Sequence, residues 1–333
     1  MLKFDEDKKR ESLNGTLDLR SAINKIVDER HEIGYDNICL LGIGGTYATA
    51  MQTDVHMKER SKLDFFVQHA SEYITTGNKR ITDKTLVLVA SASGTTEEIV
   101  KALEIIRTKG SFILGFVENP EENPIASLSD EVIIQPGGNE QLKFYMVADR
   151  LMFLNGEYDD YEEHYKELEE HLADAIVDVA YKSDGFAKRF AEKHCDHDIH
   201  YFVGSGNQYG ATYSYAMAYW EEQHWLKTKS IHSSEFFHGM FEIITKDTNV
   251  TVYIGEDSQR SLSERVANFL PKITANYEII DTKDYDLKGI SDENRGNISH
   301  IVMMEVNHRI DAYIEKYNRH PMDIRRYYRQ LDY

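Results

Sequence analysis

Short apolar runs alternate along this chain with longer segments of helical periodicity. The first five runs, each bounded by Gly, Asp, Ser or Asn, lie at residues 37–41, 63–68, 85–90, 111–117 and 131–134. The gaps between them have room for helices, and strands that alternate with helices build a parallel sheet through β-α-β units. The first half of the chain is therefore predicted to form one doubly wound α/β domain.

A second alternation follows a long acidic stretch. Residues 142–195, including 158–180, have helical periodicity and are rich in Glu and Asp, with no linker-like run of Gly, Pro or Ser. Further strands are predicted at 199–203, 250–254 and 277–281, and a final helix at about 298–317. We divide the chain into a helical N-terminal segment (1–34), a first α/β domain (35–170), and a second α/β domain with a C-terminal helix and tail (171–333).

The two alternations contain similar sequences, which indicates an internal repeat. ICLLGIGGTY at residues 38–47 aligns with HYFVGSGNQY at residues 200–209, an offset of 162. The matched pairs are Gly42 with Gly204, Gly44 with Gly206, and Tyr47 with Tyr209; at an offset of 163, Ser71-Glu72-Tyr73 matches Ser234-Glu235-Phe236. We interpret the chain as two tandem copies of one α/β unit, each a parallel, flavodoxin-like sheet flanked by helices.

The loop SASGTT at residues 91–96 follows a predicted strand and precedes a helix expected at 97–108. A helix start offers unpaired N–H groups and a positive dipole end, while Ser91, Ser93 and Thr96 add hydroxyl donors. Because the loop has no Lys or Arg, it favours a monophosphate over a triphosphate with Mg²⁺. The alternative is a Ser/Thr N-cap, which accounts for only one of the four hydroxyls.

The corresponding strand of the second copy leads into Gly255-Glu256-Asp257, so only the first copy is expected to keep an anion-binding loop. A second glycine-rich turn in the first copy, GIGGTY at residues 42–47, fails the dinucleotide pattern GxGxxG because position 47 is Tyr. Its residues Gly44, Gly45 and Thr46 are expected to face the same anion, since both turns follow carboxyl ends of parallel strands. A tight turn without a ligand is the alternative.

The densest group of polar side chains lies at residues 220–242, WEEQHWLKTKSIHSSEFFHGMFE. Carboxylates and imidazoles best move protons near neutral pH. The candidates are Glu221, Glu222, His224, His232, Glu235, His238 and Glu242. The helix expected at 209–225 is otherwise apolar, which indicates that Glu222 is held in a dry setting; a solvated acidic helix end is the alternative for Glu221 and Glu222.

Metal binding is not expected in this stretch. HExxH is absent, and the His spacings of 8 and 6 do not place ligands on one helical face. His194-Cys195-Asp196-His197 resembles a ligand set, but we interpret it as a charged turn, because nothing nearby in the sequence completes a site.

Composition narrows the functional classes. The 57 acidic and 38 basic residues give a net charge of −19. The electric field of this charge repels nucleic-acid phosphates and anionic lipids. No segment approaches the ~20 apolar residues of a membrane-spanning helix. Two cysteines, Cys39 and Cys195, are too few for a disulfide framework. We expect a cytoplasmic protein that binds neither nucleic acid nor membranes.

Together these motifs resemble sugar-isomerase (SIS) domains. GIGGTY with SASGTT, the segment GSGNQYGATYSYAMAYWEEQHW and the run SIHSSEFFHGMFEII are similar to the two SIS domains of the glucosamine-6-phosphate synthase isomerase module, and more closely to the fructosamine-6-phosphate deglycases. The resemblance covers about residues 35–333, with EFFHG as its most specific part. It implies that a sugar phosphate binds at Thr46, Ser91, Ser93 and Thr96, with a backbone contribution from Ala92.

The resemblance also implies catalytic residues. The family has a glutamate base sixteen residues before a histidine, which here gives Glu222 and His238. The histidine is placed in the neighbouring subunit's site, which implies a homodimer with shared active sites that could assemble further. Arg326 stands where the synthase carries a Schiff-base lysine near its C-terminus, and this difference argues against an imine between substrate and enzyme. Met240 stands where many relatives have Pro. Arg326 and Glu235 are further candidates for the substrate pocket.

The reaction implied is deglycation of a 6-phosphorylated sugar-amine, for example fructoselysine 6-phosphate or glucoselysine 6-phosphate, without a cofactor. The identity of the amine and its attachment at C1 or C2 stay open. One alternative is an amino-sugar phosphate isomerase or deaminase. Another is a non-catalytic sugar-phosphate sensor, although the N-terminal ~30 residues are too short and acidic for a helix-turn-helix.

Overall fold

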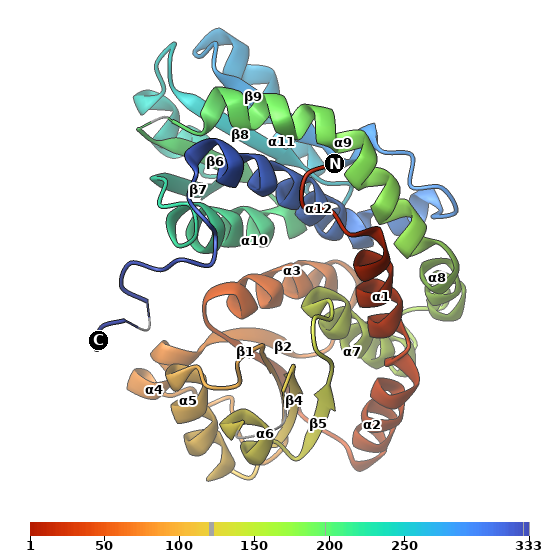
Figure 1. Cartoon of the computed structure of the whole chain (residues 1–333). Helices are drawn as coiled ribbons and strands as arrows, with labels where there is room; N and C mark the ends of the chain where they lie inside the picture. The colour runs from red at the N-terminus through yellow and green to blue at the C-terminus, as the bar shows by residue number, and fades with distance from the viewer. Residues whose placement is uncertain (120–122, 197, 329, 333) are drawn as a thin grey trace. The chain divides into compact units, whose positions relative to one another are not determined.

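The structure is a computed structural model that describes residues 1–119, 123–196, 198–328 and 330–332. The chain divides into two compact units, a first unit of residues 7–173 and a second unit of residues 1–6 and 174–333 (Figure 1). Along the described residues, no helix is both long enough and apolar enough to cross a bilayer.

The first unit contains a five-stranded parallel sheet in the order β2-β1-β3-β4-β5. Its strands are β1 Asn37–Gly42, β2 Phe65–His69, β3 Thr85–Ser91, β4 Phe112–Val117 and β5 Glu131–Ile134. The helices are α1 Glu6–Leu17, α2 Arg20–Ile33, α3 Gly44–Arg60, α4 Ala70–Thr76, α5 Glu97–Arg107, α6 Pro124–Leu128, α7 Glu140–Leu154 and α8 Tyr161–Glu167, followed by the π-helix η1 Leu168–Leu172. All five predicted strands are confirmed, with ends that differ by at most two residues.

The second unit contains a four-stranded parallel sheet in the order β7-β6-β8-β9. Its strands are β6 His200–Gly204, β7 Thr228–His232, β8 Asn249–Ile254 and β9 Tyr277–Asp281. The helical elements are α9 Ala173–His194, α10 Asn207–Ser214, the π-helix η2 Tyr215–Glu221, the 3₁₀ turns η3 Phe236–His238, η4 Met240–Ile243, η5 Leu270–Lys272 and η6 Thr282–Asp284, α11 Arg260–Phe269 and α12 Asp292–Asn318.

Three sequence-based predictions need correction in this half. β7 was not predicted, because its sequence TKSIH contains a single strongly apolar residue and lies at the sheet edge. The helix expected at 209–225 begins at Asn207, changes to π-helix at Tyr215 and ends at Glu221. α12 begins at Asp292, six residues before the expected start, since its first turn is polar and lacks the apolar period.

The predicted repeat is seen in the topology, because β7-β6-β8-β9 repeats the order of β2-β1-β3-β4. The first glycine of each repeated motif serves the same purpose. A Cβ on Gly42 would lie 2.7 Å from the Tyr47 backbone nitrogen, and one on Gly204 would lie 2.9 Å from the Gln208 carbonyl oxygen. In both copies, therefore, only glycine lets the helix start fold back so closely on the preceding strand.

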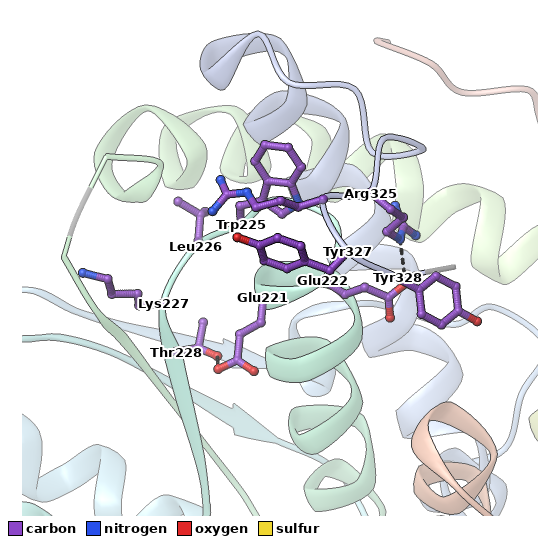
Figure 2. Close-up of a pocket in the computed structure, with 10 residues that line it drawn as sticks. Glu221, Glu222, Trp225, Leu226, Lys227, Thr228, Arg325, Tyr327 and Tyr328 are labelled. Atoms are coloured by element: carbon purple, nitrogen blue, oxygen red, sulfur yellow. Dashed lines mark hydrogen bonds and ion pairs between the residues drawn. The ribbon is translucent and has the colours of Figure 1, made fainter. Parts of the chain in front are cut away.

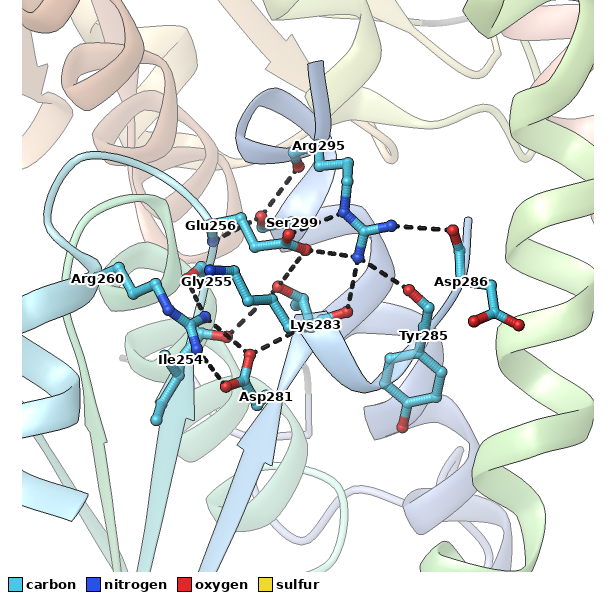
Figure 3. A network of polar contacts seen from close by, with 11 residues as sticks. Ile254, Gly255, Glu256, Arg260, Asp281, Lys283, Tyr285, Asp286, Arg295 and Ser299 are labelled. Atoms are coloured by element: carbon cyan, nitrogen blue, oxygen red, sulfur yellow. Dashed lines mark hydrogen bonds and ion pairs between the residues drawn. The ribbon is translucent and has the colours of Figure 1, made fainter. Parts of the chain in front are cut away.

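Charged hydrogen bonds to neighbouring elements hold the loop after β8 in the second unit (Figure 3). Glu256 accepts hydrogen bonds of 2.8 and 3.0 Å from the Arg295 guanidinium, and Arg260 donates to Asp281 at 2.8 Å. Asp257 accepts a 2.9 Å bond from the backbone N–H of Asn207, the first residue of α10. A side-chain carboxylate thus occupies the N-terminus of α10, in the loop where the sequence predicted loss of anion binding.

A buried polar cluster lies among α3, α7 and α8 in the first unit. The Asp149 carboxylate is fully buried and is bonded by His56 Nε2 at 2.5 Å and by the Tyr165 hydroxyl at 2.7 Å. Burial alone would raise the pKa of Asp149, but these partners hold it below its usual value. Burial lowers the pKa of the neighbouring His164 to about 4, despite the opposing charge of Asp149.

The first unit is expected to lose stability as the pH falls from about 6.5 to 4. In this window the unfolded chain protonates His164 and the folded chain does not, so the free energy of unfolding falls by about 3 kcal/mol in all. The depressed pKa of Asp149 acts in the same direction, at lower pH. Midpoints of urea unfolding at pH 7 and pH 5 would measure the effect. His164→Gln should flatten the pH dependence and the more exposed His171→Gln should not; an unchanged slope in His164→Gln would contradict the assignment.

Candidate active site

The predicted phosphate loop joins β3 to α5 in the first unit, and its backbone requires glycine at one position. Gly94 has φ +64°, and a Cβ there would lie 1.9 Å from the Asn123 amide nitrogen. The Asn123 side chain cannot move aside freely, because it caps α6 through a 3.1 Å bond from the Ala126 N–H. The loop is therefore fixed in shape by tight packing against the start of α6.

Hydroxyl groups gather within this loop. Ser91 Oγ accepts a 3.1 Å bond from the Gly94 N–H and lies 3.3 Å from Thr96 Oγ1. Thr96 occupies the N-cap position of α5, but its side chain makes no capping hydrogen bond. The N-cap alternative therefore does not account for Thr96. Ala92 and Ser93 are exposed, so a ligand can contact them.

The GIGGTY turn lies next to this loop. Gly44, with φ +60°, and Gly45 begin α3, and Thr46 Oγ1 lies 3.2 Å from the Ala90 carbonyl oxygen at the end of β3. The structure therefore brings Thr46 to the end of β3, where the SASGTT loop begins. Thr46 Oγ1 also lies 3.3 Å from the carboxylate of Glu140, the first residue of α7.

Two charged residues of α7, Glu140 and Lys143, were not predicted from the sequence. Burial raises the pKa of Glu140, and its bonds with Thr49 and Thr46 oppose that rise. Burial lowers the pKa of Lys143, one turn along α7, where Glu140 and Glu118 favour the charged ammonium. Lys143 is thus a buried amine on the helix that also carries Glu140.

A substitution can test this loop as an anion site. Thr96→Val removes one hydroxyl donor with little change of shape, and hydrogen bonds to charged groups are worth about 1.5–3 kcal/mol. We expect the affinity for inorganic phosphate, measured by calorimetry, to fall at least about tenfold. Thr108→Val, which alters an exposed hydroxyl at the other end of α5, is the matched control. Equal affinities for Thr96→Val and the unmodified protein would show that Thr96 does not bind phosphate.

In the second unit, a π-helical turn places Glu222. The Glu222 N–H donates to the Met217 carbonyl at 3.0 Å, a bond from residue i to residue i−5. Such turns are rare and occur frequently at functional sites. The side chain is 36% exposed, so the expectation of a dry setting is wrong, and its carboxylate accepts a 2.8 Å bond from Arg325 Nε.

A pocket of about 580 Å³ opens beside Glu222 (Figure 2). It is lined by the end of η2 and the following segment together with the C-terminal tail: Glu221, Glu222, Trp225, Leu226, Lys227, Thr228, Arg325, Arg326, Tyr327 and Tyr328. Glu222 and the predicted Arg326 therefore share one pocket. The volume is within the usual range for small-molecule sites, about 300–1,000 Å³.

Glu235 and His238 lie on a different loop of the same unit. Both are exposed at the 3₁₀ turn η3, where the His238 N–H donates to the Glu235 carbonyl at 3.0 Å. Neither residue lines the pocket at Glu222. Met240 is buried in the hydrophobic core of the unit, so its side chain packs inward.

The other candidate histidines have structural partners. Buried His224 bonds to Asp311 at 3.0 Å, which also accepts from the Tyr215 hydroxyl, and this contact anchors the chain just after Glu222. His232 bonds to Ser234 at 2.8 Å, and His194 bonds to Asn249 at 3.1 Å. His197 lies outside the described residues. No group of three or more metal-ligating side chains is found in the part of the chain that the structure describes.

Comparison with known proteins places this geometry in context. Residues 34–153 match the SIS domain family. Fructosamine deglycase FrlB of Bacillus subtilis is 28% identical over 305 residues, which are 90% of this chain and 93% of that protein. Fructoselysine 6-phosphate deglycase of Escherichia coli K12 is 25% identical over 314 residues, covering 92% of this chain and 89% of that protein.

Solved structures show the same fold. A Bacillus subtilis protein described as a candidate phosphosugar isomerase superposes with a TM-score of 0.87 at 24% identity, covering 98% of this chain and all of that chain. The C-terminal domain of glucosamine-fructose-6-phosphate aminotransferase from Francisella tularensis superposes with a TM-score of 0.74 at 15% identity, covering 93% and 94%. Both likenesses extend over both units.

Proposed function

We propose that this SIS-domain protein is a deglycase, which cleaves a 6-phosphorylated sugar-amine to a hexose 6-phosphate and a free amine. The single observation that carries the proposal is Glu222, a carboxylate placed by a π-turn at the edge of a pocket and oriented by Arg325. The similarity to two curated deglycases over about nine-tenths of the chain supports it. The repeated strand order supports a second SIS domain in the second unit.

The proposed reaction starts from a 1-amino-1-deoxyketose 6-phosphate. Glu222 removes a proton from C1 while the C2 oxygen gains one, which gives an enaminol. A proton returned to C2 then gives an imine at C1. Water adds to C1, the C–N bond breaks, and the products are glucose 6-phosphate and the amine.

His238 is proposed to assist ring opening and to protonate the sugar oxygen. It does not line the pocket of its own unit at Glu222, which agrees with the family pattern in which the histidine serves the neighbouring subunit's site. The active unit is therefore proposed to be a homodimer. The phosphate is proposed to bind Gly44, Gly45, Thr46, Ser91, Ala92, Ser93 and Thr96.

Coupled assays for glucose 6-phosphate and fructose 6-phosphate test the proposal, because a C1-linked adduct releases the aldose phosphate and a C2-linked adduct releases the ketose phosphate. The purified protein is given 6-phosphofructosyl-lysine, the C2-linked glucoselysine 6-phosphate and glucosamine 6-phosphate in parallel. Release of the sugar phosphate from the fructosamine alone supports deglycation of an amine attached at C1. Release from glucoselysine 6-phosphate supports the same mechanism for an amine attached at C2. Turnover of glucosamine 6-phosphate alone would favour an amino-sugar isomerase or deaminase, and binding without turnover would favour a sensor.

A further inference from the structure

The helical segment before Glu222 ends in an unusual backbone conformation. The N–H groups of Glu222 and His224 each donate to a carbonyl five residues earlier, at 3.0 and 2.9 Å. The next residue, Trp225, has a φ of +59°, a left-handed value that bulky residues rarely adopt. Such conformations are costly and persist only where surrounding contacts hold them in place. The turn at Glu222 therefore needs a support outside its own backbone.

One buried carboxylate on α12 provides that support. Asp311 Oδ1 accepts a 2.9 Å bond from the Tyr215 hydroxyl and lies 3.0 Å from His224 Nε2. All three side chains are buried. Tyr215 is the first residue of the π-helix η2, and His224 follows its last residue, Glu221, by three positions. Asp311 therefore ties together the two ends of the segment that leads to Glu222.

The bonds to Asp311 are not easily exchanged for others. Burial, and then the charge of Asp311, raise the pKa of the Tyr215 hydroxyl, so this group keeps its proton and donates. The second oxygen of Asp311 and Nδ1 of His224 have no hydrogen-bond partner among the described residues. Loss of either donor would thus leave a buried carboxylate with one bond fewer and no described replacement.

Loss of the π-turn would move the side chain of Glu222 by a large amount. A π-turn holds one residue more than an α-helical turn, so its loss rotates each later side chain by about 100°, the angle between successive α-helical residues. Glu222 would then leave its place beside Arg325, whose Nε donates to it at 2.8 Å. A misplacement of about 1 Å can lower the rate of an enzyme about 10²-fold.

We propose that Asp311 is a positioning residue, which holds Tyr215 and His224 and so keeps the π-turn that places Glu222 at the pocket. The inference rests on the proposed function, in which Glu222 is the base. Asp311 does not line the pocket, so it acts through the backbone of η2. The residues proposed to bind the phosphate belong to the first unit, so loss of Asp311 should lower kcat and leave KM nearly unchanged.

Substitutions of Asp311 and of its two donors test this role. Asp311→Ala should lower kcat for 6-phosphofructosyl-lysine about 10–100-fold and change KM by less than about threefold. Asp311→Asn keeps an oxygen that can accept both bonds and should recover most of the rate. Tyr215→Phe and His224→Gln each remove one donor and should each lower kcat by a smaller factor; they carry the test if Asp311→Ala does not fold.

Asn249→Ala is the matched control for a general loss of stability. Asn249, the first residue of β8, is buried and bonds to buried His194 at 3.1 Å, so its removal breaks a buried bond outside η2 and α12. It should lower the melting temperature and leave kcat unchanged. Equal falls of kcat in Asn249→Ala and Asp311→Ala would overturn the positioning role, and so would an unchanged kcat in Asp311→Ala.

Hydrogen exchange separates this inference from the proposed function, because it requires no turnover. The backbone N–H groups of residues 217–226 should exchange at least about tenfold faster in Asp311→Ala than in the unmodified protein or in Asn249→Ala. Faster exchange in a protein that cleaves no sugar-amine would overturn the deglycase and leave Asp311 as the residue that holds the turn. Unchanged exchange in Asp311→Ala would overturn the positioning role, whether or not the protein is a deglycase.

Discussion

Glu222→Gln is expected to lower kcat for 6-phosphofructosyl-lysine by about 10³-fold while the substrate still binds. A positioned general base contributes roughly 10²–10⁴-fold, and the amide keeps the shape of the carboxylate without its basicity. Single-turnover kinetics with the coupled glucose 6-phosphate assay measure the rate, and calorimetry measures the binding.

Glu242→Gln is the control for this experiment, since Glu242 is an exposed carboxylate of the same polar stretch that lies outside the pocket. Its rate should match that of the unmodified protein. A Glu222→Gln variant that retained more than a few per cent of the rate with intact binding would show that another group removes the proton.

The largest expected loss of stability comes from Asp149→Ala. Removal of one partner from a buried ion pair typically costs about 3–5 kcal/mol, because the other partner is left buried and uncompensated. Here His56 and the Tyr165 hydroxyl would both lose their acceptor. For a unit of this size the melting temperature should fall by about 10 °C, as measured by calorimetry.

Asp159→Ala provides the comparison, because Asp159 is an exposed aspartate of the same unit, ten residues along the chain. It should shift the melting temperature by no more than about 2 °C. A similar small shift in Asp149→Ala would mean that the buried cluster contributes little to the stability of the fold.

The sheet could be predicted from sequence where its strands are buried on both faces. β1, β3 and β8 lie inside their sheets with every residue buried, so their sequences are apolar runs that stand out. β7 lies at an edge, has one apolar residue among its five and no fully buried residue, and it was missed. Edge strands need fewer apolar side chains, so their periodicity is weaker.

The candidate site also has one part that could be predicted from the sequence and one part that could not. SASGTT is a contiguous motif whose chemistry is visible in the sequence. The pocket combines η2 with a tail about a hundred residues away, and nothing in the sequence pairs Arg325 with Glu222, to which it bonds. The π-turn also cannot be recognised in the sequence, because an apolar segment has the same composition whether its backbone hydrogen bonds span four residues or five. The consecutive arginines 325 and 326 were the one available hint.

Asp257 distinguishes the second copy of the predicted repeat from the first. With its carboxylate bonded to the start of α10, the second half carries a permanent substitute for a bound anion. In the proposed function, the first half instead binds the phosphate of the substrate. Each polypeptide is then expected to bind one sugar phosphate rather than two. On this interpretation, one copy of the predicted repeat keeps an open anion site, and the other carries its own carboxylate in the corresponding place.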